Sequence, residues 1–295
     1  MADYRRQVPV AGYELHEPYI QRAMNGETTA LLADQQILMF ALTSGTTAAR
    51  KHIPITQQYL DDYRRGWNLW GLRALKKHKQ AFLKPILQLA GDDDEYRTTA
   101  NIPCGNLSGL TARVQKKVMR WMYVLPASSG KIKDSRVRMY LALRFGIPKK
   151  LGMLMSANPS TLVNLARALE SEQDILLRDI ADGTLDPNLD IPRDIRQLLT
   201  RKLRPNRERA KELEGFANRE GVLLPSAAWP CDRMLIGCWM GGSVGPYLRQ
   251  LPRYYGTTPI RDLGLLASEG RMSIPIEDGT TSGVLDVATH FYEFI

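Results

Sequence analysis

Residues 36–56 read QILMFALTSGTTAARKHIPIT, in which an apolar run, a loop of hydroxyls and glycine, a basic pair and a second apolar run follow one another. Small residues in such a loop let a ligand approach the backbone, and its N–H and hydroxyl groups can donate hydrogen bonds. Lys51 adds a positive charge beside the loop. The stretch is typical of a phosphate-binding turn between two strands, although its residue order is not that of a Walker loop. Taken alone, it is explained equally well by an ordinary Ser/Thr-rich hairpin turn.

A second polar turn lies between apolar runs near the end of the chain, at ASEG, residues 267–270. Its hydroxyl can contact a phosphate oxygen, and its carboxylate can hold Mg²⁺, which prefers hard oxygen ligands together with phosphate. Together with the first loop, this turn favours a magnesium-nucleotide site. Alone, Glu269 is more simply interpreted as an exposed turn residue with no metal.

The two turns together resemble the first two nucleotide motifs of the acyl-adenylate-forming superfamily. Within it, the chain is similar to the auxin-responsive acyl acid amido synthetases of plants and their bacterial relatives. Further stretches resemble that family in the same order: VPVAGYE at 8–14, IPIT at 53–56, WMGG at 239–242 and FYEFI at 291–295. Plant members carry Tyr-Ala-Ser-Ser-Glu where this chain has LLASE at 265–269. The resemblance therefore supports the role of the glutamate and does not support a plant hormone as substrate.

The resemblance implies an α/β fold, the large N-terminal domain of an acyl-adenylate-forming enzyme, with layered α/β subdomains and an incomplete β-barrel part. Residues 1–295 are then an incomplete N-terminal adenylation domain. The mobile C-terminal domain with its lysine, and a third motif with a ribose-binding aspartate, are expected to be absent. Strand and helix signals alternate through the second half of the chain, which independently favours α/β layers with a largely parallel sheet.

The implied function is ATP-dependent activation of a carboxylic acid as acyl-AMP, followed by amide formation with an amine or amino acid. We expect ATP and Mg²⁺ as cofactors, and a partial or inactive enzyme from this chain by itself. The expected phosphate-binding residues are Thr43, Ser44, Gly45, Thr46, Thr47, Ala267 and Ser268. The expected catalytic residues are Lys51, Ser268 and Glu269, with Glu269 also the metal ligand.

A long helix is predicted to begin after Thr56, a good N-cap residue, and to run to about Lys79. It carries an aromatic stripe at helical spacing, formed by Tyr59, Tyr63, Trp67 and Trp70. Core packing is the simpler interpretation of such a stripe. In the family, however, this helix borders the acyl pocket, so that the candidate substrate-binding residues are Tyr63, Trp67, Gly241 and Gly242.

The remaining patterns predict further elements. Strands are expected over 120–126, 151–156, 234–239 and 289–294, and a loop over 95–111. Helices are expected over 134–145, 193–201 and 207–220. A helix from Asn158 to about Glu170 should be followed by a separate segment, Ile175 to Ile180, that leads to a stop at Gly183.

A serine hydrolase is an alternative, because GGSVG at 241–245 matches the nucleophile elbow Gly-x-Ser-x-Gly and follows a predicted strand. Asp262 or Asp286, and then His290, follow Ser243 in the order expected of a triad. Against it, Pro246 restricts the turn and His290 lies in a strand-like run. A non-catalytic fragment is the third hypothesis.

Composition sets the remaining bounds. The chain has 295 residues, 44% of them hydrophobic, and a formal net charge of +9. We find no membrane span and no secretory signal, and the three cysteines suit free thiols in a reducing cytoplasm. Their spacing gives no zinc site. The basic clusters at 73–79 and 201–211 are interpreted as solvated helix faces, so we expect small-molecule substrates and no nucleic acid.

Overall fold

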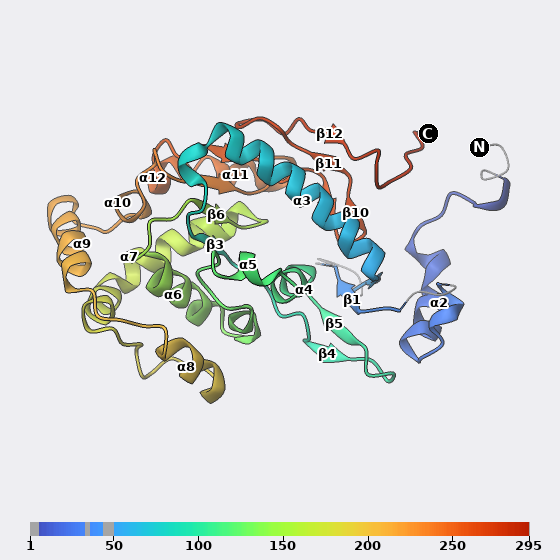
Figure 1. Ribbon diagram of the computed structural model, residues 1–295, viewed down its shortest axis with the longest axis horizontal. Coiled ribbons are helices and arrows are strands. Elements are labelled where there is room, and N and C mark those ends of the chain that lie inside the picture. The colour runs from blue at the N-terminus through green and yellow to red at the C-terminus, as the bar shows by residue number, and fades with distance from the viewer. Residues whose placement is uncertain (1–5, 33–35, 44–49, 295) are drawn as a thin grey trace.

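The structure is a computed structural model that describes residues 6–32, 36–43 and 50–294 (Figure 1). The longer helices are α2 (Tyr13–Met24), α3 (Gln57–Lys77), α6 (Ser135–Gly146), α7 (Pro159–Asp182), α8 (Arg193–Thr200) and α9 (Arg207–Glu220). The shorter helices are α4 (Leu107–Arg113), α5 (Lys117–Arg120), α10 (Pro225–Ala228), α11 (Gly245–Leu248) and α12 (Leu251–Tyr255). Helices and strands alternate along the chain, as the sequence predicted for an α/β fold.

The central sheet is parallel throughout and has the strand order β3-β6-β7-β8. Its strands are β3 (Ile86–Gln88), β6 (Met153–Met155), β7 (Leu235–Gly237) and β8 (Ile260–Arg261). Every residue of β6 and β7 is buried, as expected for strands covered on both faces. The strands predicted over 151–156 and 234–239 are therefore confirmed, with shorter bounds.

The second sheet is mixed and has the order β2-β1-β5-β4. Its strands are β1 (Met39–Leu42), β2 (His52–Ile55), β4 (Tyr96–Arg97) and β5 (Pro103–Gly105). β1 pairs with β2 antiparallel and with β5 parallel, so the two predicted apolar runs are confirmed as strands. The loop predicted over 95–111 is wrong, because β4, β5 and α4 lie there. These elements are too short to show a periodic apolar pattern.

The helical layer is built on α7, which packs against α6 and α9. The predicted break near Glu170 is wrong, since α7 is one helix of 24 residues. The polar residue Glu172 interrupts the apolar pattern of this helix. It is nevertheless buried, because it accepts a hydrogen bond from Arg136 Nε at 2.7 Å. The helix begins at Asn158, whose side chain accepts from the Ser160 N–H, and ends at Gly183 in the left-handed conformation.

Residues 120–126 do not form the predicted strand. They follow α5 and touch the edge strand β3 at one isolated bridge, between Ile86 and Tyr123. The Ile86 N–H donates to the Met122 carbonyl, and the Val124 N–H donates to the Ile86 carbonyl. This segment is therefore extended enough to lie along the sheet but too briefly paired to be a strand.

α3 begins as predicted, because the Thr56 side chain accepts a hydrogen bond from the Tyr59 N–H, and it ends two residues early at Lys77. It lies beside the last strands of the chain, which form two short antiparallel ladders (Figure 1). These pair β9 (Leu266–Ala267) with β10 (Gly270–Arg271), and β11 (Ser273–Ile274) with β12 (Val284–Leu285). The incomplete β-barrel part implied by the resemblance stays a prediction. The strand predicted over 289–294 is wrong, since the segment after β12 has no regular structure.

Candidate functional site

The base of the first loop is held closed by its two flanking residues. The Thr43 N–H donates to the Lys51 carbonyl at 3.2 Å, and the Lys51 N–H donates to Thr43 Oγ1 at 3.3 Å. These two contacts lie directly beyond the last pair of the β1–β2 ladder, Leu42 with His52. The predicted phosphate-binding residues Ser44, Gly45, Thr46 and Thr47 lie outside the described residues.

The two basic residues after the loop have different surroundings. Arg50 forms an ion pair with Glu95 at 2.8 Å. The Lys51 ammonium lies 5.2 Å from the centroid of the Tyr13 ring, and it has no acidic partner among the described residues. Of the pair, Lys51 is thus the one whose charge is not neutralised by a described acidic residue.

The second motif forms a tight hairpin. Ala267 pairs with Gly270 across the β9–β10 ladder, so Ser268 and Glu269 are the two residues of the connecting turn. Ser268 is half-buried, while Ala267 and Glu269 are exposed. A Cβ atom at Gly270 would lie 2.8 Å from the His290 ring, which explains why glycine follows the glutamate.

A cavity of about 300 Å³ lies between α3 and β10, and we call it the α3–β10 cavity. Pro54 and Thr56, which follow the first loop, line it together with Gly270 and Arg271, which follow the second turn. Its other lining residues are Leu32, Gln58, Tyr59, Asp62, Tyr63, Thr289 and His290. Segments about 200 residues apart that carry the two motifs therefore meet at one cavity.

The aromatic stripe of α3 faces this cavity at one end and the core at the other. Tyr59 and Tyr63 are stacked with ring centroids 5.8 Å apart, and both line the cavity. Trp67 contacts Tyr63 edge-on, and Trp70 donates to the Asp262 carbonyl at 2.8 Å. Of the two predicted substrate-binding aromatics, Tyr63 lines the cavity and Trp67 lies behind it.

The sequence reasoning missed Arg271, which follows the second turn in β10. Its side chain is 2% exposed, and its Nη2 donates to the Leu263 carbonyl at 2.7 Å. Its Nε and Nη1 atoms are buried without a hydrogen-bond partner among the described residues. Burial lowers its pKa to about 10. A charged residue directly after Ser-Glu-Gly, in a strand that packs on aromatics, was the signal that could have revealed it.

The predicted glycines Gly241 and Gly242 do not line the α3–β10 cavity. Both are exposed, and the position of a Cβ on Gly241 would lie 3.5 Å from Thr281. Gly242 begins a short 3₁₀ helix that ends at Val244. These residues shape the turn after β7.

The geometry does not assemble a serine hydrolase triad. Both carboxylate oxygens of Asp262 accept backbone hydrogen bonds, one from Met240 N–H at 2.6 Å and one from Gly264 N–H. His290 packs against Gly270, and within the described part of the chain no hydrogen bond joins it to Ser243. Ser243 is exposed in the 3₁₀ turn.

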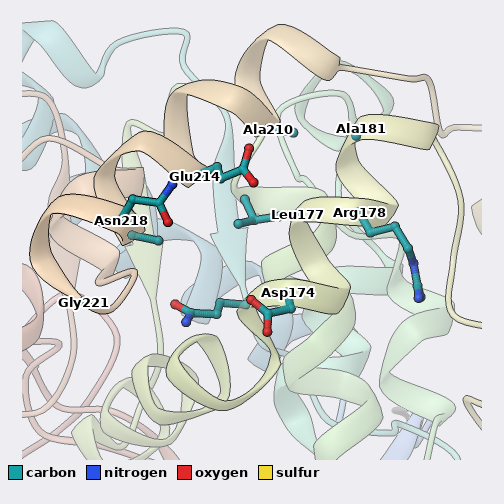
Figure 2. Close-up of a pocket in the computed structure, with 10 residues that line it drawn as sticks. Asp174, Leu177, Arg178, Ala181, Ala210, Glu214, Asn218 and Gly221 are labelled. Atoms are coloured by element: carbon teal, nitrogen blue, oxygen red, sulfur yellow. The ribbon is translucent and has the colours of Figure 1, made fainter.

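A second cavity, of about 670 Å³, lies between α7 and α9 (Figure 2). Asp174 and Leu177 line it from α7, and Glu214 and Asn218 line it from α9, while the Arg178 side chain extends away from these residues. None of the described residues predicted from the two motifs lines this cavity, although it is larger than the α3–β10 cavity.

Three further observations concern the described residues. The described residues contain no group of three or more His, Cys, Asp or Glu side chains placed to hold a metal ion. No helix in the described part of the chain is long and apolar enough to cross a bilayer. All three cysteines are free thiols.

Known proteins resemble this chain in both sequence and fold. A jasmonoyl–L-amino acid synthetase, GH3.5 of Oryza sativa subsp. japonica, is 27% identical over 99% of this chain and 52% of its own length. An indole-3-acetic acid-amido synthetase, GH3.10 of Arabidopsis thaliana, is 23% identical over 92% of this chain and 48% of its own length. The chain thus spans about half the length of these curated relatives.

The structure of a GH3.15 acyl acid amido synthetase superposes with a TM-score of 0.76 at 23% identity, covering 91% of this chain and 47% of that one. The structure of AtGH3.15 in complex with 2,4-DB superposes with a TM-score of 0.77 at 21% identity. These likenesses confirm the α/β fold. The family model for the GH3 family N-terminal domain matches residues 1–260, and this chain therefore belongs to the GH3 family.

Proposed function

We propose that this chain is the acid-activating part of an acid–amino acid amido synthetase. The observation that carries the proposal is the α3–β10 cavity, where the strand after the Thr-Ser-Gly-Thr-Thr loop and the strand after the Ser-Glu turn line one space. The relatives named above are a jasmonoyl–L-amino acid synthetase and an indole-3-acetic acid-amido synthetase. We extend the reaction type to this chain and leave its acid and amine to experiment.

Two polar segments would hold the nucleotide. Thr43 to Thr47 would donate hydrogen bonds to the β- and γ-phosphates, with Lys51 beside them as a positive charge. Ala267 and Ser268 would lie at the α-phosphate. ATP, when bound, supplies the phosphoanhydride that activates the acid. The work of these residues is to hold the reacting groups in line and to balance their negative charge.

Glu269 is suited to hold Mg²⁺. It is exposed at the tip of the β9–β10 turn and forms no ion pair with another described residue. Mg²⁺ bound with nucleotides typically takes only one or two carboxylates and completes its shell with phosphate oxygens and water. A single glutamate therefore fits the ion even though the described residues offer no larger ligand cluster.

The acid would lie in the α3–β10 cavity, against the faces of Tyr59 and Tyr63 with Trp67 behind them. Close approach of adenine or the acyl group at Gly241 and Gly242 stays a prediction, without support from this cavity. Amide formation with an amine or amino acid belongs to the whole protein. We also propose a cytoplasmic location, which three free cysteines support.

Pyrophosphate release from ATP and Mg²⁺ with a panel of carboxylic acids tests the proposal. Glu269→Ala should abolish acid-dependent release, whereas Glu277→Ala, which changes an exposed glutamate on the following loop, should leave it unchanged. Calorimetry of Mg-ATP with the 295-residue chain is the second readout. The absence of both pyrophosphate release and Mg-ATP binding in the unaltered chain would contradict the proposal. Equal activity in the two variants would exclude the metal role of Glu269.

A further inference from the structure

His290 lies outside both sequence motifs, yet it lines the α3–β10 cavity. A Cβ atom at Gly270 would lie 2.8 Å from both Cε1 and Nε2 of His290, so this edge of the imidazole rests directly on the Gly270 backbone. Gly270 closes the Ser-Glu turn, since it pairs with Ala267 across the β9–β10 ladder. The imidazole therefore contacts the residue that directly follows the proposed metal ligand, Glu269.

The ring nitrogens of His290 are available to a ligand. No hydrogen bond joins either nitrogen to another described residue, and neither is among the enclosed side-chain atoms that lack a partner. In this they differ from Nε and Nη1 of Arg271, which are enclosed. A neutral imidazole carries one N–H donor in either tautomer. His290 can thus donate a hydrogen bond to a ligand without a change in its protonation.

The position of the ring is fixed although its segment has no regular structure. The Asp286 N–H and the Tyr292 hydroxyl both donate to the Met272 carbonyl, at 2.9 and 2.8 Å. Between these two anchors, the His290 N–H donates to the Asp286 carbonyl at 3.3 Å. The His290 ring packs edge-on against Tyr292, with centroids 6.1 Å apart. A side chain that is already held in this way loses less conformational freedom when it binds a ligand.

The polar neighbours of His290 in the cavity wall are already engaged elsewhere. Asp62 lines the cavity from α3, but its Oδ2 accepts from Gln58 Nε2 at 3.0 Å and its Oδ1 lies 3.5 Å from Arg65 Nη2. The Thr289 hydroxyl donates to the Asp286 carbonyl at 3.3 Å. Neither side chain accepts from the imidazole, which leaves its N–H for a ligand.

We propose that His290 is a further phosphate-binding residue at the Ser-Glu turn and that its imidazole donates a hydrogen bond to the α-phosphate of the bound nucleotide. Phosphate oxygens accept hydrogen bonds strongly because they are charged. During activation, an oxygen of the acid bonds to this phosphorus while the bond to pyrophosphate breaks. A donor that holds the α-phosphate therefore holds the reacting centre in line. This inference rests on the proposed function and adds to it a residue from outside both motifs.

AMP and adenosine are the probes, because they differ only in the phosphate. Titration calorimetry with the complete chain should show AMP binding at least about tenfold more tightly than adenosine. In His290→Leu, which has no donor, this ratio should fall by about tenfold while the affinity for adenosine is unchanged. His290→Gln keeps an N–H donor and should retain most of the ratio. His16→Leu, which changes an exposed histidine on α2, is the matched control and should not alter it.

NMR of the unaltered chain gives a second measurement that does not depend on the folding of His290→Leu. AMP should shift the imidazole signals of His290 more than adenosine does. The spectrum of His290→Gln assigns these signals among those of the four histidines. Equal shifts with the two probes would overturn the inference. So would an unchanged ratio in His290→Leu, or a parallel loss of both affinities, which is the mark of a purely structural role.

Mg-ATP calorimetry and pyrophosphate release on the same samples separate the two proposals. A chain that binds Mg-ATP and whose AMP-to-adenosine ratio does not depend on His290 refutes only the role of His290. A chain whose AMP affinity depends on His290, but which neither binds Mg-ATP nor releases pyrophosphate, refutes only the proposed function. A chain that binds none of these nucleotides refutes both.

Discussion

The guanidinium of Arg271 lies 4.4 Å from the centroid of the Trp67 ring, so a charge on β10 is stacked on an aromatic side chain of α3. Such cation–π contacts are attractive, and more so when they are shielded from water. Trp67 in turn contacts Tyr63, which lines the α3–β10 cavity. The contact therefore links the strand after the Ser-Glu turn to the wall of the proposed acid site.

Gly66→Ala should disturb this contact, because its Cβ would lie 2.5 Å from Cδ of Arg271. We expect the free energy of unfolding to fall by about 1–3 kcal/mol as the arginine is displaced. Gly71→Ala is a matched control on the same helix, where a Cβ meets no atom within 4 Å. For Gly71→Ala we expect the free energy of unfolding to rise by about 0.5–1 kcal/mol, because alanine has a higher helix propensity than glycine. Urea unfolding measures both, and equal effects would contradict the packing described.

Asp278 should make the free energy of unfolding depend on pH in the acidic range. Burial would raise its pKa, but hydrogen bonds from Lys77, His78 and Arg261 outweigh burial and hold the pKa below its ordinary value. A carboxyl with a lowered folded-state pKa stabilises the fold above its unfolded-state pKa, near 4, and this stabilisation is lost as the pH falls through the folded value.

Unfolding of Asp278→Asn at pH 7, 5, 4 and 3 tests this dependence. The variant should be less stable than the unaltered chain at pH 7, and the difference should shrink below about pH 4. Asp182→Asn is a suitable comparison, since Asp182 forms no described ion pair. A difference between Asp278→Asn and the unaltered chain that stays constant from pH 7 to 3 would show that Asp278 is not held in this way.

The three cysteines should react at very different rates. Burial raises the pKa of Cys238 to about 12 and that of Cys104 to about 11, so little thiolate forms at either site near neutral pH. Cys231 is half-exposed. With iodoacetamide at pH 8 and mass spectrometry, we expect one rapidly modified thiol, and Cys231→Ser should remove it. Rapid modification of Cys104 or Cys238 in the folded chain would be the contrary result.

We expect Asp262 to stabilise the fold, and we expect Ser243 to have no role in catalysis. Asp262→Ala would leave the buried Gly264 N–H without its acceptor, at about 1–3 kcal/mol, and would also remove the acceptor of the part-buried Met240 N–H. Ser243→Ala, at an exposed position, should change stability by less than about 0.5 kcal/mol. A phosphonofluoridate should not label Ser243, and labelling with loss of an esterase activity would restore the hydrolase hypothesis.

Much of the fold was predictable where local signals and packing agree. Thr56 begins α3 and Asn158 begins α7 through their side chains, and both starts are visible in the sequence. The buried runs of β6 and β7 are continuous and apolar, as parallel strands require. The failures occur where pairing across long distances decides the structure. β4 and β5 have two and three residues and pair with each other, and β5 joins the sheet through its pairing with the distant strand β1.

The two polar turns of the candidate site could be predicted from the sequence. The cavity at which they meet could not. The sequence shows that each turn is polar, but the meeting of Pro54 and Gly270 at one cavity depends on the whole α/β fold between them. Arg271 went unnoticed for the same reason, since an arginine in a strand is ordinary until its burial is known. Gly241 and Gly242, in contrast, were predicted from the sequence to let a ligand approach the backbone. In the structure they lie in an exposed turn.

The β9–β10 hairpin places a limit on how this protein can change during evolution. Only Ser268 and Glu269 stand between the paired residues Ala267 and Gly270. Because side chains alternate between the two faces of a strand, inserting or deleting one residue here would turn Arg271 away from Trp67. Drift in the identity of the turn residues is compatible with the fold, but drift in their number is not. Natural variants of this segment should therefore differ by substitution and keep its length.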